Sequence, residues 1–333
     1  MTSITPVVLA APYTPPPPPL PRFTGMEMTW TGWDGSVWDL TSASSGVIVT
    51  KAGLRGLHMP EHERWSRSAP LVPGSRHLGH QVLDRSVFWP IAVFHDATSR
   101  DWITLDRAFW RTMDPDREGT WTVVLPTGER RYLKCRFVDD SSHSLDKDPI
   151  LKGWDVYGIN MVADYPYWRG DVVTNAVQAA DPVTWMDPED EPFMSISQVA
   201  SLNAAAINNP GDIDAHPTFW VHGPTDSASV GAGGRSIGIP FEIDDGKTLV
   251  VDCNPTSRSA KLINSPDLNA PFAAQVKQVE ERVPTGTDRT KDLSADSNLN
   301  IKVSAGGRQD LELEMAGAGR IRTLITPSYR RAW

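Results

Sequence analysis

The chain has 333 residues, of which 40% are hydrophobic and 22% charged, and its formal net charge is −9. No stretch approaches the ~20 apolar residues that a membrane-spanning helix requires, so we expect no membrane span. The acidic balance argues against a specific nucleic-acid binder, because contacts with phosphate backbones need a basic surface. Single hydrophobic cores usually stop growing at roughly 250 to 300 residues, so the length predicts two domains.

The N-terminal segment, residues 1–25, is rich in proline. Residues 15–19 are an uninterrupted proline run, and because proline fixes φ and lacks an amide donor, this run predicts a stiff polyproline II stretch. The apolar residues 7–11 have no basic residue before them, which does not fit a secretory signal. We expect an arm that acts as a spacer or clamps a neighbouring subunit. A ligand for an aromatic-lined groove is the alternative.

Residues 26–170 predict a first domain made mainly of β-strands. Alternating apolar residues from Met26 to Trp30, a turn at 32–35 and a second run from Val37 indicate a hairpin. Further strands are expected at 47–50, 87–94, 120–125, 130–138 and 151–163. Residues 55–80 have no clear pattern and are expected to form a long loop.

One amphipathic helix is predicted within this domain. Thr98 and Asp101 have the spacing of a capping box, and Pro115 ends the helical pattern. The apolar stripe recurs at spacings of three and four, as Trp102, Leu105, Phe109 and Met113. We therefore expect a β-sandwich-like body carrying one amphipathic helix.

The second half predicts a linker and another β domain. Residues 171–210 are weakly patterned and acidic near 187–191, with a possible short helix at 201–209. Residues 211–333 contain short strands at close spacing, which is typical of a second β-sandwich. These strands are expected at 218–222, 236–239, 248–252, 260–263, 301–303, 310–315 and 320–326.

The residues that could catalyse a reaction or bind a metal do not form a recognised pattern. The histidine pairs lack a third ligand, and Pro60 would break a helix between His58 and His62. The remaining pairs are His77 with His80 and His216 with His222. The aspartate pairs 139–140 and 244–245 fall where turns are expected, and aspartate is common there because it caps backbone amides. We expect no catalytic residue, no metal site and no cofactor.

The two cysteines and the glycine-rich segment also have structural explanations. Cys135 and Cys253 lie 118 residues apart, which fits neither a zinc site nor a disulfide scaffold, so both are expected to be reduced and half-buried. Residues 231–234 lack the lysine and serine of a phosphate-binding loop.

Charge and tryptophan are unevenly distributed along the chain. Residues 51–111 carry nine Lys or Arg against six Asp or Glu, whereas residues 171–300 carry eight against nineteen. Complementary patches of this kind can orient subunits head to tail, although two differently solvated surfaces would give the same asymmetry. Ten of the thirteen tryptophans lie between Trp30 and Trp168, where we expect them to fill a core and also to form interfaces.

Several short segments form a recognisable series when they are taken in chain order. In the first half they include WTGWDGSVWDLT at 30–41, DRAFWR at 106–111, GTWTV at 119–123 and YPYW at 165–168. In the second half they include NPGD at 209–212, DGKTLVVD at 245–252 and RAW at 331–333. Together these segments resemble the minor tail proteins of distal-tail type from long-tailed phages that infect actinobacteria. The resemblance implies that residues 211–333 form a galectin-like β-sandwich.

The resemblance also implies a function. Six copies would form a ring through the first domains, in the virion, at the distal end of the tail, after assembly in the host cytoplasm. The ring would join the tail tube protein to a tail-tip hub protein, and its lumen would let the tape measure protein and then DNA pass. This task needs complementary faces and an inert wall, so the resemblance implies a structural protein and not an enzyme.

Candidate residues for contacts between subunits come from segments that an isolated core explains poorly. They are Pro15, Pro19, Arg55, Arg64, Arg67, Arg76 and Trp333. Most belong to the N-terminal proline run and to the 55–80 loop, and loops of this length in compact domains are usually functional or disordered.

Two other functions are compatible with the sequence. The second domain could be a module that binds host cell-wall glycan, because β-sandwiches often present ligand loops. A cell-wall hydrolase that uses the aspartate pairs is the other alternative.

Overall fold

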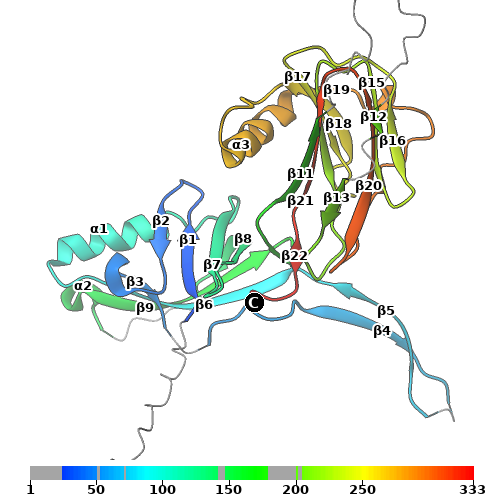
Figure 1. The fold of residues 1–333 in the computed structure, drawn as a ribbon. Helices are drawn as coiled ribbons and strands as arrows, with labels where there is room; N and C mark the ends of the chain where they lie inside the picture. Colours follow the sequence, from blue (N-terminus) through cyan, green and yellow to red (C-terminus); the bar gives the residue numbers. More distant parts are fainter. Residues whose placement is uncertain (1–24, 51–52, 71–72, 142–146, 179–199, 202–204) are drawn as a thin grey trace, which may run out of the picture.

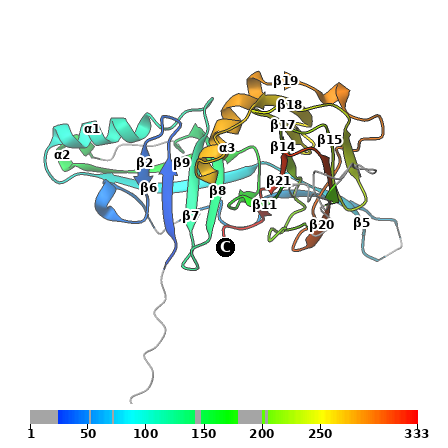
Figure 2. The same ribbon diagram turned by 45° about the horizontal axis from the view of Figure 1, so that its top comes forward.

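The computed structural model describes residues 25–50, 53–70, 73–141, 147–178, 200–201 and 205–333. The protein is mainly β, as the sequence predicts, with 45% of the described residues in strands and 13% in helices. Two β-rich bodies lie side by side, and a two-stranded arm projects from the first of them (Figures 1 and 2).

The first body is built on one antiparallel sheet. Its strands follow the order β2 (Val37–Asp39), β1 (Glu27–Thr31), β7 (Gly119–Val124), β8 (Arg130–Asp139), β9 (Trp154–Ala163), β6 (Arg85–Phe94) and β3 (Val47–Val49). Two short strands extend it beside β8, β10 (Trp168–Arg169) and β22 (Ser328–Tyr329).

This sheet folds over so that its two ends meet. The first part of β8 pairs with β7, and a register shift between Phe137 and Asp139 marks the part that pairs with β9. Leu40 then connects the ends, because its amide donates to Met28 O and its carbonyl accepts from Val49 N. The inner side of the folded sheet therefore encloses the core. This arrangement has the sandwich-like form that was expected for the first body.

Four tryptophans form the centre of this core. Trp30, Trp89, Trp121 and Trp168 are almost fully buried. Successive rings meet edge to face at centroid distances of 5.2, 5.1 and 5.0 Å, and each such pair contributes ~0.5–1.5 kcal/mol beyond the burial of its area. Gly119 makes room for them, since a Cβ at that position would lie 2.1 Å from a ring atom of Trp30.

Helix α1 (Ser99–Trp110) covers one side of the first body (Figure 1). It begins where the sequence predicts, with Thr98 Oγ1 accepting a hydrogen bond from Asp101 N at 3.2 Å. Trp102 and Phe109 form its buried face. The short helix α2 (Pro149–Lys152) precedes β9, within the range where we predicted only strand.

The arm corrects one prediction. Residues 55–80 were expected to be an irregular loop, but they contain β4 (His62–Arg67) and most of β5 (Arg76–Val82), which pair with each other. All six side chains of β4 are exposed. Because neither face of this hairpin is buried, the sequence has no alternation of apolar and polar residues from which strands could be predicted.

The second body is a sandwich of two sheets. One sheet has the order β11 (Val173–Gln178), β21 (Arg320–Ile325), β14 (Thr218–His222), β17 (Lys247–Asp252), β18 (Ser259–Asn264) and β19 (Thr287–Asp288). The other contains β12 (Ala200–Ser201), β20 (Arg308–Ala316), β15 (Ser227–Ala232) and β16 (Ser236–Ile239), and β13 (Ala206–Asn208) also pairs with β20. Buried aliphatic side chains such as Val221, Leu249, Val230 and Leu313 meet between the sheets.

Helix α3 (Phe272–Arg282) packs on the outer face of the six-stranded sheet. Val279 of the helix joins Trp220 and Leu324 of the sheet in a second, smaller apolar cluster. The sequence analysis missed this helix.

The region between the bodies differs from the expected linker. Within residues 171–210, strand β11 belongs to the six-stranded sheet, and β13 replaces the short helix expected at 201–209. The strand expected at 301–303 is reduced to an isolated bridge between Val303 and Ala215. The range expected to form only the second domain also returns to the first body, because β22 pairs with β10.

His222 is a buried, uncharged group in the second body. Its Nδ1 lies 2.8 Å from Thr248 Oγ1, which in turn lies 2.8 Å from Ser265 Oγ. Burial, together with the nearby Arg322 and Arg320, lowers the pKa of His222 to about 4. As the pH falls below the unfolded-state pKa of ~6.5, the unfolded chain binds the proton first, so stability is lost between about pH 6.5 and pH 4.

The replacement Gly119→Ala should lower the free energy of unfolding by about 1–3 kcal/mol, because the new methyl group overlaps Trp30 in a packed core. Gly25→Ala is the matched control, since a Cβ there meets no atom within 4 Å. Urea denaturation followed by tryptophan fluorescence measures both. Equal stability of the two variants would contradict the described packing.

For His222, the difference in unfolding free energy between pH 7.5 and pH 5 should shrink by on the order of 2 kcal/mol in His222→Asn, because the titrating group is lost. Urea denaturation at both pH values gives the comparison. An unaltered pH dependence in His222→Asn would show that His222 does not titrate as described.

Candidate assembly surface

The arm carries most of the residues that the sequence analysis singled out. Arg64 lies opposite His80, and Arg67 lies opposite Arg76, with a bulge between Trp65 and Ser66. The outer edges of β4 and β5 pair with no other strand among the described residues. An isolated two-stranded hairpin is marginally stable at best in water, so this arm is suited to packing against another molecule.

The arm also exposes apolar side chains. Trp65 lies over Gly79 and is 46% exposed, and Leu78 is 60% exposed. Large aromatic side chains and arginines are the residue types enriched at protein interfaces. From residue 64 to residue 80 the chain has three arginines and no Asp or Glu. The outer part of the arm is therefore both basic and apolar.

Three histidines lie close together on the arm. The ring centroids of His62 and His80 are 6.0 Å apart, and those of His77 and His80 are 6.3 Å apart. In the part of the chain that the structure describes, no three His, Cys, Asp or Glu side chains are placed to hold a metal ion.

Arg85 fixes the root of the arm. Its side chain is almost fully buried. Nε donates to Pro166 O at 2.6 Å, Nη1 donates to Gly56 O at 2.8 Å and to His58 O, and Nη2 donates to Arg330 O at 2.8 Å. Burial lowers the pKa of Arg85 to about 10, which still leaves the group charged at neutral pH. One cation thus holds four carbonyl groups from three separate segments.

The C-terminal residues complete this junction. Arg131 stacks on the ring of Tyr329 at 3.5 Å. Ala332 is fully buried in the first core, and its amide donates to Leu57 O at 2.9 Å. Trp333 packs edge to face on His58 with centroids 5.0 Å apart. The chain thus passes from the second body to the root of the arm.

The structure brings the candidate interface residues into two groups. Arg64, Arg67 and Arg76 lie on the arm. Arg55 and Trp333 lie near its root, where Arg55 N donates to Phe88 O at 2.9 Å and Trp333 contacts His58. Pro15 and Pro19 lie outside the described residues.

Sequence reasoning missed Arg85 and Tyr329. The available signal for Arg85 was a charged residue two positions before the strongly apolar strand residues 87–94, since a charge there must find compensating polar groups. Its acceptors are carbonyl groups of distant segments, which side-chain patterns do not reveal.

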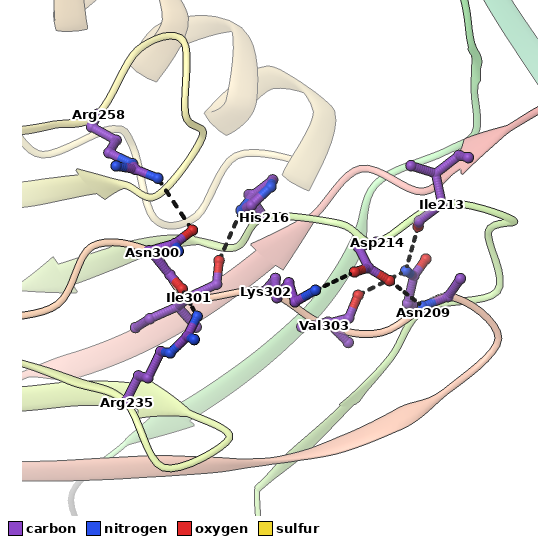
Figure 3. Close-up of polar contacts among 11 residues, drawn as sticks. Asn209, Ile213, Asp214, His216, Arg235, Arg258, Asn300, Ile301, Lys302 and Val303 are labelled. Carbon is purple, nitrogen blue, oxygen red and sulfur yellow. Dashed lines mark hydrogen bonds and ion pairs between the residues drawn. The ribbon is translucent and has the colours of Figure 1, made fainter. Parts of the chain in front are cut away.

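The second body contains a network of polar side chains of the types that could bind a glycan (Figure 3). His216 Nδ1 donates to Ile301 O at 2.9 Å, Arg258 donates to Asn300 Oδ1 at 3.2 Å, and Lys302 pairs with Asp214 at 2.7 Å. These side chains hold residues 300–303 against the sandwich. Each of these side chains therefore makes a hydrogen bond or ion pair within the fold.

A cavity of about 680 Å³ lies beside this network, between α3, the six-stranded sheet and the segment that joins the two bodies. Its floor includes Val172, Trp220 and Leu324, and Tyr165, covered by Arg169 at 4.7 Å, lies at its edge.

The sequence of the chain matches curated proteins of mycobacteriophages. It is 24% identical over 205 residues to minor tail protein Gp27 of Mycobacterium phage L5, and the match covers 59% of this chain and 61% of that protein. It is 23% identical over 205 residues to minor tail protein Gp27 of Mycobacterium phage D29, with the same coverage. The chain is homologous to these minor tail proteins. The match spans about three fifths of the relatives' own length, and no family model matches the chain.

Solved structures show the same fold over almost the whole chain. The Dit protein of phage SPP1 superposes on this chain with a TM-score of 0.57 at 14% sequence identity, and the match covers 92% of this chain and 99% of that one. That protein is described as a paradigm of the hub adsorption apparatus in phages that infect Gram-positive bacteria. A chain of the phage P2 baseplate in its activated conformation gives a TM-score of 0.53 at 8% identity, covering 91% and 98%. The predicted resemblance to a distal tail protein is confirmed by the homology and by this fold.

Replacing Arg85 with Met should lower the free energy of unfolding by about 3 kcal/mol, because buried carbonyl groups lose a charged donor. It should also raise hydrogen exchange at the amides of residues 328–332. Arg100→Met, an exposed position on α1, is the control and should change neither. Unchanged protection of the Ala332 amide in Arg85→Met would contradict the role of Arg85.

Proposed function

We propose that this chain is a non-enzymatic structural subunit of a phage tail that assembles into a ring, with six copies joined through the first bodies. The observation that carries the proposal is the arm, a basic and apolar hairpin that pairs with no other strand among the described residues and whose β4 side chains are all exposed. The homology to minor tail proteins supports a structural role in the tail.

The geometry of the arm favours a ring over a symmetric dimer. The arm extends from one side of the first body, away from α1 and α2 (Figure 1). If it binds a different surface on the next copy, the contact is heterologous, and repeated heterologous contacts close into a ring when the rotation permits.

In the virion, this ring would lie at the distal end of the tail. Its neighbours would be the tail tube protein on one side and a tail-tip hub protein on the other, with the tape measure protein in the lumen. The fold shared with the Dit protein of SPP1 supports this position.

The glycan-binding alternative has less support from the second body. Its His, Asn and Arg side chains shown in Figure 3 are bonded to the chain itself, and Trp220 is buried beneath α3. Helices that could cross a membrane are absent from the described part of the chain.

Reversing the charges of the arm tests the proposal. Arg64→Glu, Arg67→Glu and Arg76→Glu together should raise the concentration needed for half-assembly by roughly 10- to 100-fold, the equivalent of ~1–3 kcal/mol of interface energy. Light scattering and negative-stain class averages of the purified protein measure the assembly.

The matched control changes the net charge by the same amount at positions outside the arm. It combines Arg100→Glu, Arg107→Glu and Lys277→Glu, at residues that are exposed on α1 and α3. This variant should still assemble. A wild-type protein that stays monomeric over a range of salt and protein concentrations, or an arm variant that assembles normally, would contradict the proposal.

A further inference from the structure

A small apolar surface lies at the far end of the first body from the arm. Within residues 150–156, four large apolar side chains are exposed, Ile150, Leu151, Trp154 and Val156. Leu151 is 85% exposed and Trp154 is 48% exposed. We call these four residues the distal patch. In Figure 1, α2 and the start of β9, which carry them, lie at one end of the molecule and β4 and β5 lie at the other.

Local folding explains why these side chains face outward. α2 ends at Gly153, whose φ of 72° and backbone amide bonded to Pro149 O turn the chain into β9. Trp154 and Val156 then lie on the same, outer face of β9, and Tyr157, Ile159 and Met161 fill the core from the other face. Lys152 lies over the Trp154 ring at 4.5 Å. An exposed tryptophan next to exposed aliphatic residues is typical of an interaction site.

The charge around the distal patch is opposite to that of the arm. Among the described residues from 138 to 156 there are four aspartates and two lysines, whereas residues 64–80 contain three arginines and no Asp or Glu. Both surfaces also offer large apolar side chains, which are Trp65 and Leu78 on the arm. Opposite charge and matched apolar contact together favour binding between the two surfaces.

We propose that the distal patch is the surface that receives the arm of the next copy of this chain. This inference rests on the proposed ring and names the second surface of its subunit contact. Because the two surfaces lie at opposite ends of one subunit, each copy can donate its arm to one neighbour and accept the arm of another. The contact buries Trp65, Leu78, Leu151 and Trp154 at once, and it supplies the partner that an isolated hairpin needs.

The sign of an added charge provides the first test. Leu151 is almost fully exposed, so neither Leu151→Arg nor Leu151→Asp should disturb the fold. Leu151→Arg places a positive charge opposite the arginines of the arm and should raise the concentration for half-assembly at least tenfold. Leu151→Asp loses the same apolar side chain but places a negative charge opposite those arginines, so it should raise this concentration several-fold less than Leu151→Arg does. Equal effects of the two variants, or no effect of either, would overturn the proposal.

Cross-linking provides the second test and leaves the apolar side chains in place. The double variant Ser66→Cys, Lys152→Cys should form covalently linked dimers, trimers and larger species on mild oxidation, because one cysteine lies on the arm and the other next to the distal patch. Each single variant should give at most a dimer, and Ser66→Cys with Lys277→Cys should give no ladder. Cys135 and Cys253 are buried, so they do not compete.

The outcomes separate this inference from the proposed function. A wild-type protein without a ring overturns both. A ring that forms normally in Leu151→Arg, with no ladder from the Ser66→Cys, Lys152→Cys variant, overturns only the distal patch and points to another tail protein as its occupant.

Discussion

The buried guanidinium of Arg85 holds together the segments on which the geometry of the arm depends. Its four carbonyl acceptors lie before β4, in the turn before β10 and in the C-terminal segment. A buried cation requires nearly complete hydrogen bonding, so these segments cannot move apart without exposing it or leaving it unpaired. The core of the first body therefore fixes the direction in which the arm projects, although the side chains of the arm are themselves exposed.

The sequence predicted best those elements that have one buried face. The tryptophan-rich hairpin, strand β6 and helix α1 were all predicted, because the fold buries alternate residues or one helical stripe in each. Helix α3 was missed although Phe272, Val276 and Val279 in the helix and Val283 directly after it are spaced by four, three and four. The arm and β22 could not be predicted in this way, because the hairpin has no buried face and the two-residue strand pairs only through distant tertiary contacts.

The candidate assembly surface was predicted in part. Four arginines in a long segment without a pattern indicated an exposed, functional region, and the structure gathers three of them, Arg64, Arg67 and Arg76, on one projecting hairpin. The distal patch gave no such signal, because Leu151, Trp154 and Val156 look like core residues of a strand in the sequence. Only the local turn at Gly153 and the register of β9 show that they face outward.

In the proposed assembly, the arm of each copy of the chain contacts a neighbouring copy. A cryo-electron microscopy map of the purified assembly, at a resolution that traces strands, tests this most directly. The account predicts a closed ring in which β4 and β5 of each subunit cross to the neighbouring first body and cover residues 150–156. Density that places both strands against their own subunit, or leaves them free in solvent within a closed ring, would contradict it.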